Sequence, residues 1–175
     1  MGASLVTHFQ MLGRYNTIAN ERVYAVCAEL TDEEYRQEGI GSFRSIHKTL
    51  NHILLGDQIW LTRFTTPDAT STPALATVLY DEFPALREAR ALEDARVQTF
   101  LDGLTESFLR GTVTYVNSSG KLFEDPILLV LQHVFNHQTH HRGQLHVMLS
   151  QFGKTVNLDM HRAIHPEWQA VEHSA

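Results

Sequence analysis

The chain has 175 residues, 43% of them apolar, and a formal net charge of −6, a balance that indicates a folded domain and excludes a disordered one. The acidic charge argues against a nucleic-acid surface, because phosphate neutralisation needs clustered Lys and Arg. The single Cys27 excludes an internal disulfide and a cysteine-rich zinc site. No apolar run reaches the ~20 residues of a membrane-spanning helix and no signal peptide is recognisable, so we expect one cytoplasmic domain over residues 1–175 with no membrane partner.

The first segment, from about Ser4 to Leu30, is predicted to be a helix because its apolar residues recur at helical period. These residues are Phe9, Leu12, Ala19, Val23, Val26 and Leu30. Asn16 falls inside this stripe, so its amide is either a satisfied structural group or part of a site, and the structural interpretation is favoured. The polar residues 31–41 end in Gly-Ile-Gly and are predicted to form a loop.

A second helix is predicted from about Phe43 to Phe64, with Ser42 as its N-cap. Its main apolar stripe also contains Asp57. The apolar members of the stripe are Phe43, Ile46, Leu50, Ile53, Leu54, Leu61 and Phe64. His52 lies nearly opposite, on a weaker apolar strip. That strip is completed by Leu55 and Ile59. A helix that is apolar on two sides is typical of one enclosed by its neighbours in a bundle.

Residues 65–72 contain Pro and small polar side chains and are predicted to form a loop. Pro73, after a Thr72 cap, fits the start of a third helix that extends to about Gly103, and Pro84 would kink or break it. Its inward residues are predicted to be Leu75, Leu79, Leu86, Phe100 and Leu101. Residues 111–124 alternate β-branched side chains around Asn-Ser-Ser-Gly, which predicts a β-hairpin.

Asp125 and Pro126 are the predicted N-cap and first residue of the last long helix, and Gly153 is its predicted end. We expect a packed tail with one helical turn over residues 158–168 and disorder over residues 171–175. Four long helices and one insertion predict an all-α, antiparallel four-helix bundle with a small β-hairpin before the last long helix. Metal sites in such bundles are built from facing helices.

Residues 133–153 hold five of the eleven histidines. These are His133, His137, His140, His141 and His146. His137 and His141 lie one turn apart, project within about 40° of each other, and share the apolar face of Val130 and Val134. Two neighbouring buried imidazoles are unfavourable without partners, and a metal ion supplies one, so this pair predicts a metal site. His133 lies at the edge of that face and His140 points away from it.

The second helix offers three candidates for a further ligand, namely His47, His52 and Asp57. A catalytic zinc-type centre usually has three protein ligands and one open position. His47 and His52 diverge by about 140° and cannot easily reach one ion together. Spacing does not decide among the three, although the helical wheel favours Asp57 because it faces the larger apolar stripe.

Three stretches resemble the DinB family of metal-binding helical bundles. They are residues 15–22 (YNTIANER), residues 42–60 (SFRSIHKTLNHILLGDQIW) and residues 136–144 (NHQTHHRGQ). Their order and spacing match the family, with one departure at Ile18, where the family commonly has Trp. The resemblance implies a four-helix bundle, a divalent ion and frequent homodimers. It also implies that the ligands are His52, His137 and His141, so that Asp57 is instead a buried acid near the site or a helix–helix contact.

Three neutral imidazoles leave the charge of an ion uncompensated, so the ion would act as a Lewis acid and lower the pKa of bound water or thiol. We therefore expect a metal-dependent enzyme with zinc or nickel and a small-molecule substrate. It would be a hydrolase or, as the resemblance implies, a thiol-dependent S-transferase or isomerase with a low-molecular-weight thiol. Asp57, His133 and Asn16 are the nearest polar candidates for a base, and none is assigned as catalytic. The alternative is a non-catalytic, metal-stabilised stress-response or binding module, whose ion a fourth protein ligand would saturate.

Overall fold

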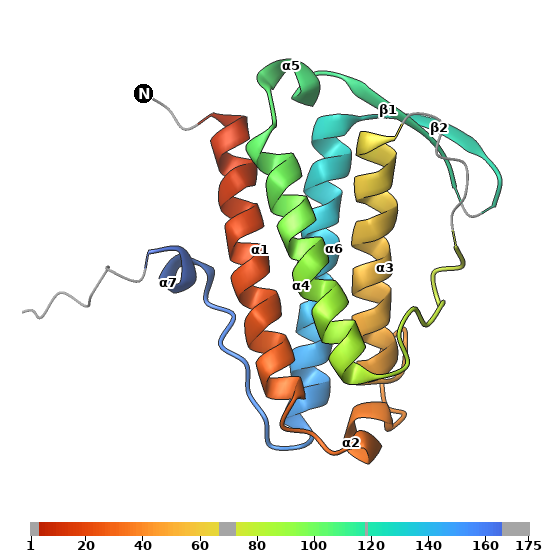
Figure 1. Cartoon of the computed structure of the whole chain (residues 1–175), viewed down its shortest axis with the longest axis vertical. Coiled ribbons are helices and arrows are strands. Elements are labelled where there is room, and N and C mark those ends of the chain that lie inside the picture. Colours follow the sequence, from red (N-terminus) through yellow and green to blue (C-terminus); the bar gives the residue numbers. More distant parts are fainter. Residues whose placement is uncertain (1–3, 67–72, 118, 166–175) are drawn as a thin grey trace, which may run out of the picture.

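Four long helices form the body of the protein in the computed structural model, which describes residues 4–66, 73–117 and 119–165. They are α1 (Leu5–Cys27), α3 (Ile46–Thr65), α4 (Phe83–Asp102) and α6 (Ile127–Ser150). α1 and α6 run in one direction and α3 and α4 in the other (Figure 1). α1 packs chiefly against α4 and α3 chiefly against α6, so both of these pairs are antiparallel. The prediction of a helical bundle with a hairpin before the last long helix is confirmed.

A short helix, α2 (Asp32–Arg36), occupies the region predicted to be a loop. Thr31 and Glu34 form a capping box, in which the side chain of each residue accepts a hydrogen bond from the backbone N–H of the other. This arrangement satisfies two of the N–H groups that a helix start leaves unpaired, and it explains why a polar segment becomes helical. The prediction of a loop over residues 31–41 is therefore wrong at its beginning.

α3 begins three residues later than predicted. Ser45, and not Ser42, is the N-cap, and its side chain accepts a hydrogen bond from the Lys48 N–H. Arg44 has a φ of 64°, in the left-handed region, so the right-handed helix cannot extend back through it. The weaker strip with His52 is as buried as the main stripe, which confirms that neighbours enclose α3 on both sides.

α4 begins ten residues later than predicted, at Phe83, with Pro84 in its first turn. Pro84 therefore marks a helix start and not an internal kink, and the expectation of a helix from Pro73 is wrong. The proposed Thr72 cap lies outside the described residues. Leu86 and Leu101 are buried as expected, whereas Leu75 is 48% exposed and its predicted inward position is wrong.

The predicted hairpin is confirmed as β1 (Thr112–Val116) and β2 (Leu122–Pro126), antiparallel strands that pair Thr112 with Pro126 and Val116 with Leu122. A short helix, α5 (Glu106–Leu109), precedes it. Asp125 does not cap α6, because its carboxylate accepts a hydrogen bond from the Tyr115 hydroxyl and Pro126 takes the N-cap position. Gly153, with a φ of 69°, follows the end of α6 as predicted.

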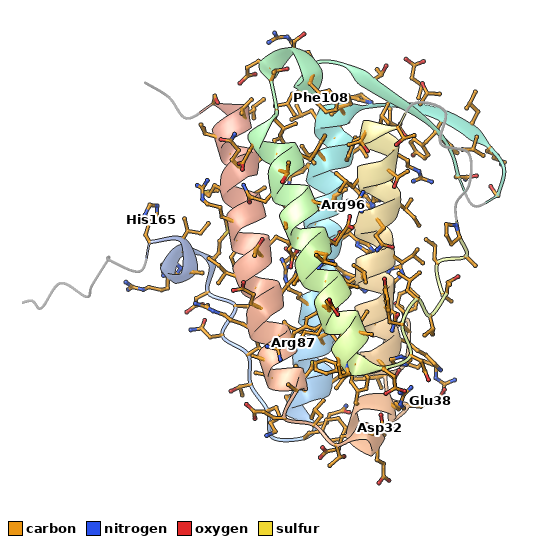
Figure 2. All side chains as sticks on the ribbon, in the orientation of Figure 1. Asp32, Glu38, Arg87, Arg96, Phe108 and His165 are labelled. Carbon is orange, nitrogen blue, oxygen red and sulfur yellow. The ribbon has the colours of Figure 1, made fainter. Side chains whose placement is uncertain are left out.

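The expected helical turn in the tail is α7 (Met160–Ile164), and residues 171–175 lie outside the described part of the chain. Side chains fill the space between the long helices (Figure 2). Two apolar clusters make up the core. One contains Leu50, Leu54, Leu86, Leu145 and Leu149, and the other contains Phe9, Leu101, Leu131 and Phe135. No helix in the described residues has the length and hydropathy to cross a membrane.

Candidate metal centre

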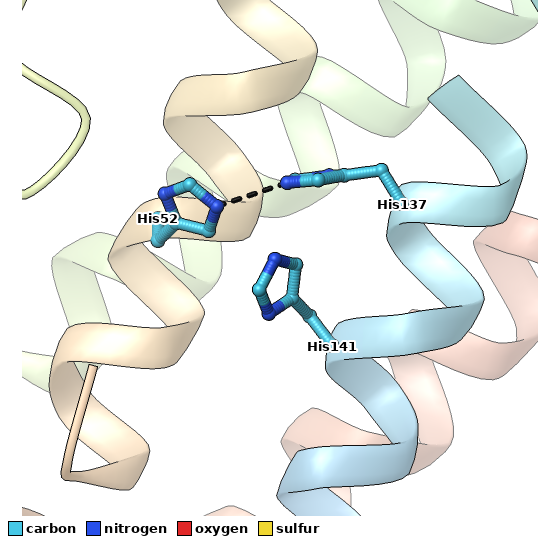
Figure 3. A group of neighbouring side chains, drawn as sticks. All are labelled: His52, His137 and His141. Carbon is cyan, nitrogen blue, oxygen red and sulfur yellow. Dashed lines mark hydrogen bonds between the residues drawn. The ribbon is translucent and has the colours of Figure 1, made fainter. Parts of the chain in front are cut away.

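Three histidines from two helices meet between α3 and α6. His52 comes from α3, and His137 and His141 come from successive turns of α6 (Figure 3). One ring nitrogen of each lies within 4.8 Å of those of the other two, and the Nε2 atoms of His52 and His137 are 2.9 Å apart. His52 and His141 are buried and His137 is partly buried. The structure thus brings together the three residues that the sequence analysis singled out.

The hydrogen bonds of His52 and His141 determine which ring nitrogen of each is available to a ligand. His52 Nδ1 lies 2.9 Å from the Leu75 carbonyl oxygen, and His141 Nδ1 lies 2.8 Å from Gln144 Oε1. Because these oxygens only accept hydrogen bonds, both Nδ1 atoms carry the proton in the neutral imidazole. Each Nε2 then keeps a lone pair, which is the usual preparation of a histidine for metal binding.

The spacing of the nitrogens also suits an ion. A tetrahedral ion with metal–nitrogen bonds of 2.0–2.1 Å holds its ligand nitrogens about 3.3 Å apart. That separation lies between the 2.9 Å of the His52–His137 pair and the 4.8 Å limit of the group. The donor set therefore fits a divalent ion after small side-chain adjustments.

Burial keeps the three imidazoles neutral. Burial, together with smaller contributions from the neighbouring His141 and His52, lowers the pKa of His137 to about 3. Burial lowers the pKa of His141 to about 4, although the hydrogen bond that His141 donates to Gln144 opposes this shift. Burial also lowers the pKa of His52, and the hydrogen bond to the Leu75 carbonyl opposes it. All three imidazoles are therefore neutral at neutral pH, which is the charge state that binds a metal ion through a ring nitrogen.

Two further residues shape the site and were not recognised as site residues from the sequence. An ideal Cβ at Gly56 would lie 3.0 Å from His137 Cε1, so only glycine gives that imidazole its present position without displacement. Phe43 stacks on His52 with ring centroids 3.8 Å apart and contacts His141 edge-on at 5.6 Å. A glycine inside a helix costs about 1 kcal/mol relative to alanine, so Gly56 within the predicted second helix was an unfavourable choice that indicated a local packing requirement. Phe43 gave no such indication, because its place in the apolar stripe suggested a core residue.

A cavity of about 260 Å³ adjoins His52 and His137. Its other walls include Trp60 and Arg63 of α3 and Tyr115 of β1. The Arg63 guanidinium packs over both rings, 4.4 Å from the Trp60 centroid and 4.3 Å from the Tyr115 centroid, and so links the hairpin to α3. The hairpin thereby closes one side of the cavity and leaves a space of small-molecule size beside the histidines.

His133, which the sequence placed at the edge of the apolar face, lies on the wall of the same cavity. Its ring contacts Trp60 edge-on, with centroids 5.9 Å apart. His133 is exposed and does not belong to the group of three.

The other candidate ligands are engaged elsewhere. Asp57 is buried, forms an ion pair with Arg90 at 2.7 Å, and is a helix–helix contact, so the preference of the helical wheel is not supported. His47 Nε2 lies 3.2 Å from the Tyr80 carbonyl oxygen. Asn16 accepts a hydrogen bond from Arg142, in agreement with its structural interpretation. Across the part of the chain that the structure describes, no fourth His, Cys, Asp or Glu joins the three histidines.

The fold and the site together define the class of this protein. It is a helical bundle with a candidate metal centre, formed by three histidines from two helices beside a cavity. The sequence profile of the DinB family matches residues 1–171, and the chain belongs to this family. It is 32% identical over 148 residues to Protein DinB of Bacillus subtilis (strain 168), covering 81% of this chain and 84% of that protein.

Two solved structures share the fold. A DinB-like protein from Bacillus cereus has a TM-score of 0.57 and 22% identity, covering 82% of this chain and 89% of its own. A DinB-like protein from Bacillus subtilis has a TM-score of 0.57 and 16% identity, covering 83% of this chain and 94% of its own. At these identities the likeness concerns the fold alone.

Proposed function

We propose that His52, His137 and His141 bind one divalent metal ion, with zinc or nickel as the expected ions. The observation that carries the proposal is the convergence of three neutral imidazoles, two of which have their Nδ1 protons held by carbonyl oxygens. A bound ion would act as a Lewis acid and lower the pKa of water or a thiol. The chain itself supplies the orientation of the imidazoles and the cavity beside them.

We further propose that the protein is an enzyme that acts on a small molecule, either by thiol-dependent S-transfer or isomerisation or by hydrolysis. The cavity at His52 and His137 supports this proposal because it gives a substrate access to the ion. A group of three ligands supports it as well, because catalytic sites keep an open position. The burial of His52 and His141 favours the second candidate, a non-catalytic, metal-stabilised stress-response or binding module.

Metal binding is tested by replacing each histidine of the group separately with alanine and measuring bound metal after dialysis. We expect one ion per chain in the parent protein and loss of stoichiometric binding in each variant, with retained helical circular dichroism. His8→Ala, an exposed histidine of α1, is the matched control, and His47→Gln tests the assignment on α3. Full occupancy in any variant of the group, or loss in His47→Gln, would contradict the assignment.

Catalysis is tested by screening zinc- and nickel-loaded protein against several low-molecular-weight thiols with electrophilic acceptors. A parallel screen uses esters and amides without thiol. Turnover that disappears in His137→Ala and in chelator-treated protein supports an enzyme. A complete absence of turnover, combined with a large fall in melting temperature after chelation, supports the metal-stabilised module instead.

We propose a homodimer on the basis of family membership. Light scattering coupled to gel filtration measures the mass in solution directly. The proposal requires about twice the 19.9 kDa of one chain, and a mass of one chain at micromolar concentration would contradict it.

A further inference from the structure

Six buried polar side chains form a closed ring across the middle of the bundle, and each is at most 4% exposed. They are Asn20 of α1, Asp57 of α3, Arg90 and Asp94 of α4, and Gln138 and Arg142 of α6. On each of the four helices these residues lie, in sequence, between the residues that belong to the two apolar clusters. The ring is therefore a polar layer that separates two halves of an apolar core.

One half of the ring joins α3, α4 and α1. Arg90 Nη1 lies 2.7 Å from Asp57 Oδ2, and Arg90 Nη2 lies 3.0 Å from Asp94 Oδ1. Asn20 Nδ2 donates to the same Asp94 oxygen at 2.9 Å. One buried guanidinium thus pairs with two carboxylates from different helices.

The other half joins α1 back to α3 through α6. Arg142 Nη1 donates to Asn20 Oδ1 at 3.1 Å and to Gln138 Oε1 at 3.3 Å, and it also donates to Asn16. Gln138 Nε2 donates to Asp57 Oδ2, which closes the ring. Two arginines and two aspartates make the ring formally neutral.

Three ring residues directly follow residues of the candidate metal site. On α6, Gln138 follows His137 and Arg142 follows His141, and on α3 Asp57 follows the glycine against which the His137 imidazole packs. Consecutive helical residues project about 100° apart. The ring holds one face of each helix in place. It therefore also fixes the direction of the neighbouring face, which carries the imidazoles.

We propose that Gln138 and Arg142 are positioning residues that fix the rotation of α6 and thereby the geometry of the three-histidine site. Rotation of α6 would pull a buried guanidinium and a buried carboxylate away from their partners, which is strongly unfavourable. A rotation of about 10° moves a group roughly 6 Å from the helix axis by about 1 Å, beyond the ±0.2 Å over which metal–ligand distances vary. The inference rests on the proposed metal site and adds that α1 and α4, which contribute no histidine to it, help to hold it in shape.

The test compares Gln138→Met and Arg142→Lys with Leu149→Ala in the full-length protein loaded with cobalt(II). Leu149 is a fully buried residue of the same helix within an apolar cluster, so its truncation lowers stability without touching the ring. We expect the two ring variants to bind cobalt at least about 10-fold more weakly and to show an altered visible absorption spectrum. We expect Leu149→Ala to keep the parent affinity and spectrum despite a comparable fall in melting temperature.

A second measurement does not depend on the metal. The ¹⁵N chemical shifts of the imidazoles in metal-free protein report the tautomers and hydrogen bonds of His52, His137 and His141. The inference requires these shifts to change in both ring variants and to stay unchanged in Leu149→Ala. Parent-like shifts and cobalt spectra in the ring variants, or equal changes in Leu149→Ala, would overturn it. If the parent protein binds no cobalt, the proposed metal site is wrong, and the imidazole shifts still decide whether the ring positions the histidines.

Discussion

Gly56 gives the sharpest single perturbation of the candidate site. In Gly56→Ala the new Cβ would lie 3.0 Å from His137 Cε1 and 3.5 Å from His137 Nδ1, so the imidazole must move by a few tenths of an ångström. That movement is as large as the ±0.2 Å tolerance of a metal–ligand bond. We therefore expect metal affinity to fall by roughly 10–100-fold, the range seen when the support of a ligand is disturbed.

The matched control is Gly143→Ala on α6, where a new Cβ meets nothing within 4 Å. This change should stabilise the protein by up to about 1 kcal/mol through helix propensity and leave metal affinity unchanged. Gly56→Ala should gain less stability, because the contact with His137 opposes the propensity term. Competition with a chromophoric chelator measures the affinity, and urea unfolding of metal-free protein measures the stability. Parent-like affinity in Gly56→Ala would refute the argument that the glycine makes room for the ligand.

Two further predictions concern pH and helix capping. The pKa values of His137 and His141 are near 6.5 in the unfolded chain and fall to about 3 and about 4 in the folded protein. The unfolded chain therefore binds more protons than the folded protein below pH 6.5. The free energy of unfolding of metal-free protein should consequently decrease as the pH falls from about 6.5 to about 4.5. The free energy of unfolding should change by at most about 1.4 kcal/mol per pH unit for each histidine, and by less because the side chains are partly exposed. Urea unfolding at several pH values measures this slope, which should be smaller in His137→Gln. An unchanged slope in that variant would contradict the lowered pKa of His137. Ser45→Ala should lower the free energy of unfolding by about 1 kcal/mol because Ser45 caps α3. Ser42→Ala should have almost no effect. A larger loss in Ser42→Ala than in Ser45→Ala would indicate that Ser42 is the N-cap after all.

The sequence predicted part of the candidate site for physical reasons that the structure makes clear. His137 and His141 share one face of α6, so helical periodicity alone paired them. Periodicity could not find His52, because 13 of the 20 residues of α3 are buried and apolarity no longer distinguishes one face from another. The family resemblance supplied that residue. The helical wheel wrongly favoured Asp57 as the third ligand. Asp57 is buried because it pairs with Arg90, and the sequence did not indicate this partner because arginine is usually exposed.

The fold was predictable at the level of long helices and the hairpin, and less so at their ends. The start of α3 depends on the left-handed backbone of Arg44, which no sequence pattern marks. The starts of α4 and α2, in contrast, could have been predicted from the sequence. Pro84 and the Thr31–Glu34 capping box are both recognised signals of a helix start. The polar ring was not predictable, since Asn20, Asp94 and their partners come from four helices whose relative rotation only the structure gives.

The most direct test of the metal centre is X-ray absorption at the zinc edge of protein loaded with one equivalent of zinc. We expect three imidazole nitrogens at about 2.0–2.1 Å from the zinc and a further light donor from solvent, which is the signature of a site with an open position. A fourth protein ligand would contradict the proposed enzyme and favour the structural module. Fewer than three imidazoles would contradict the site formed by His52, His137 and His141.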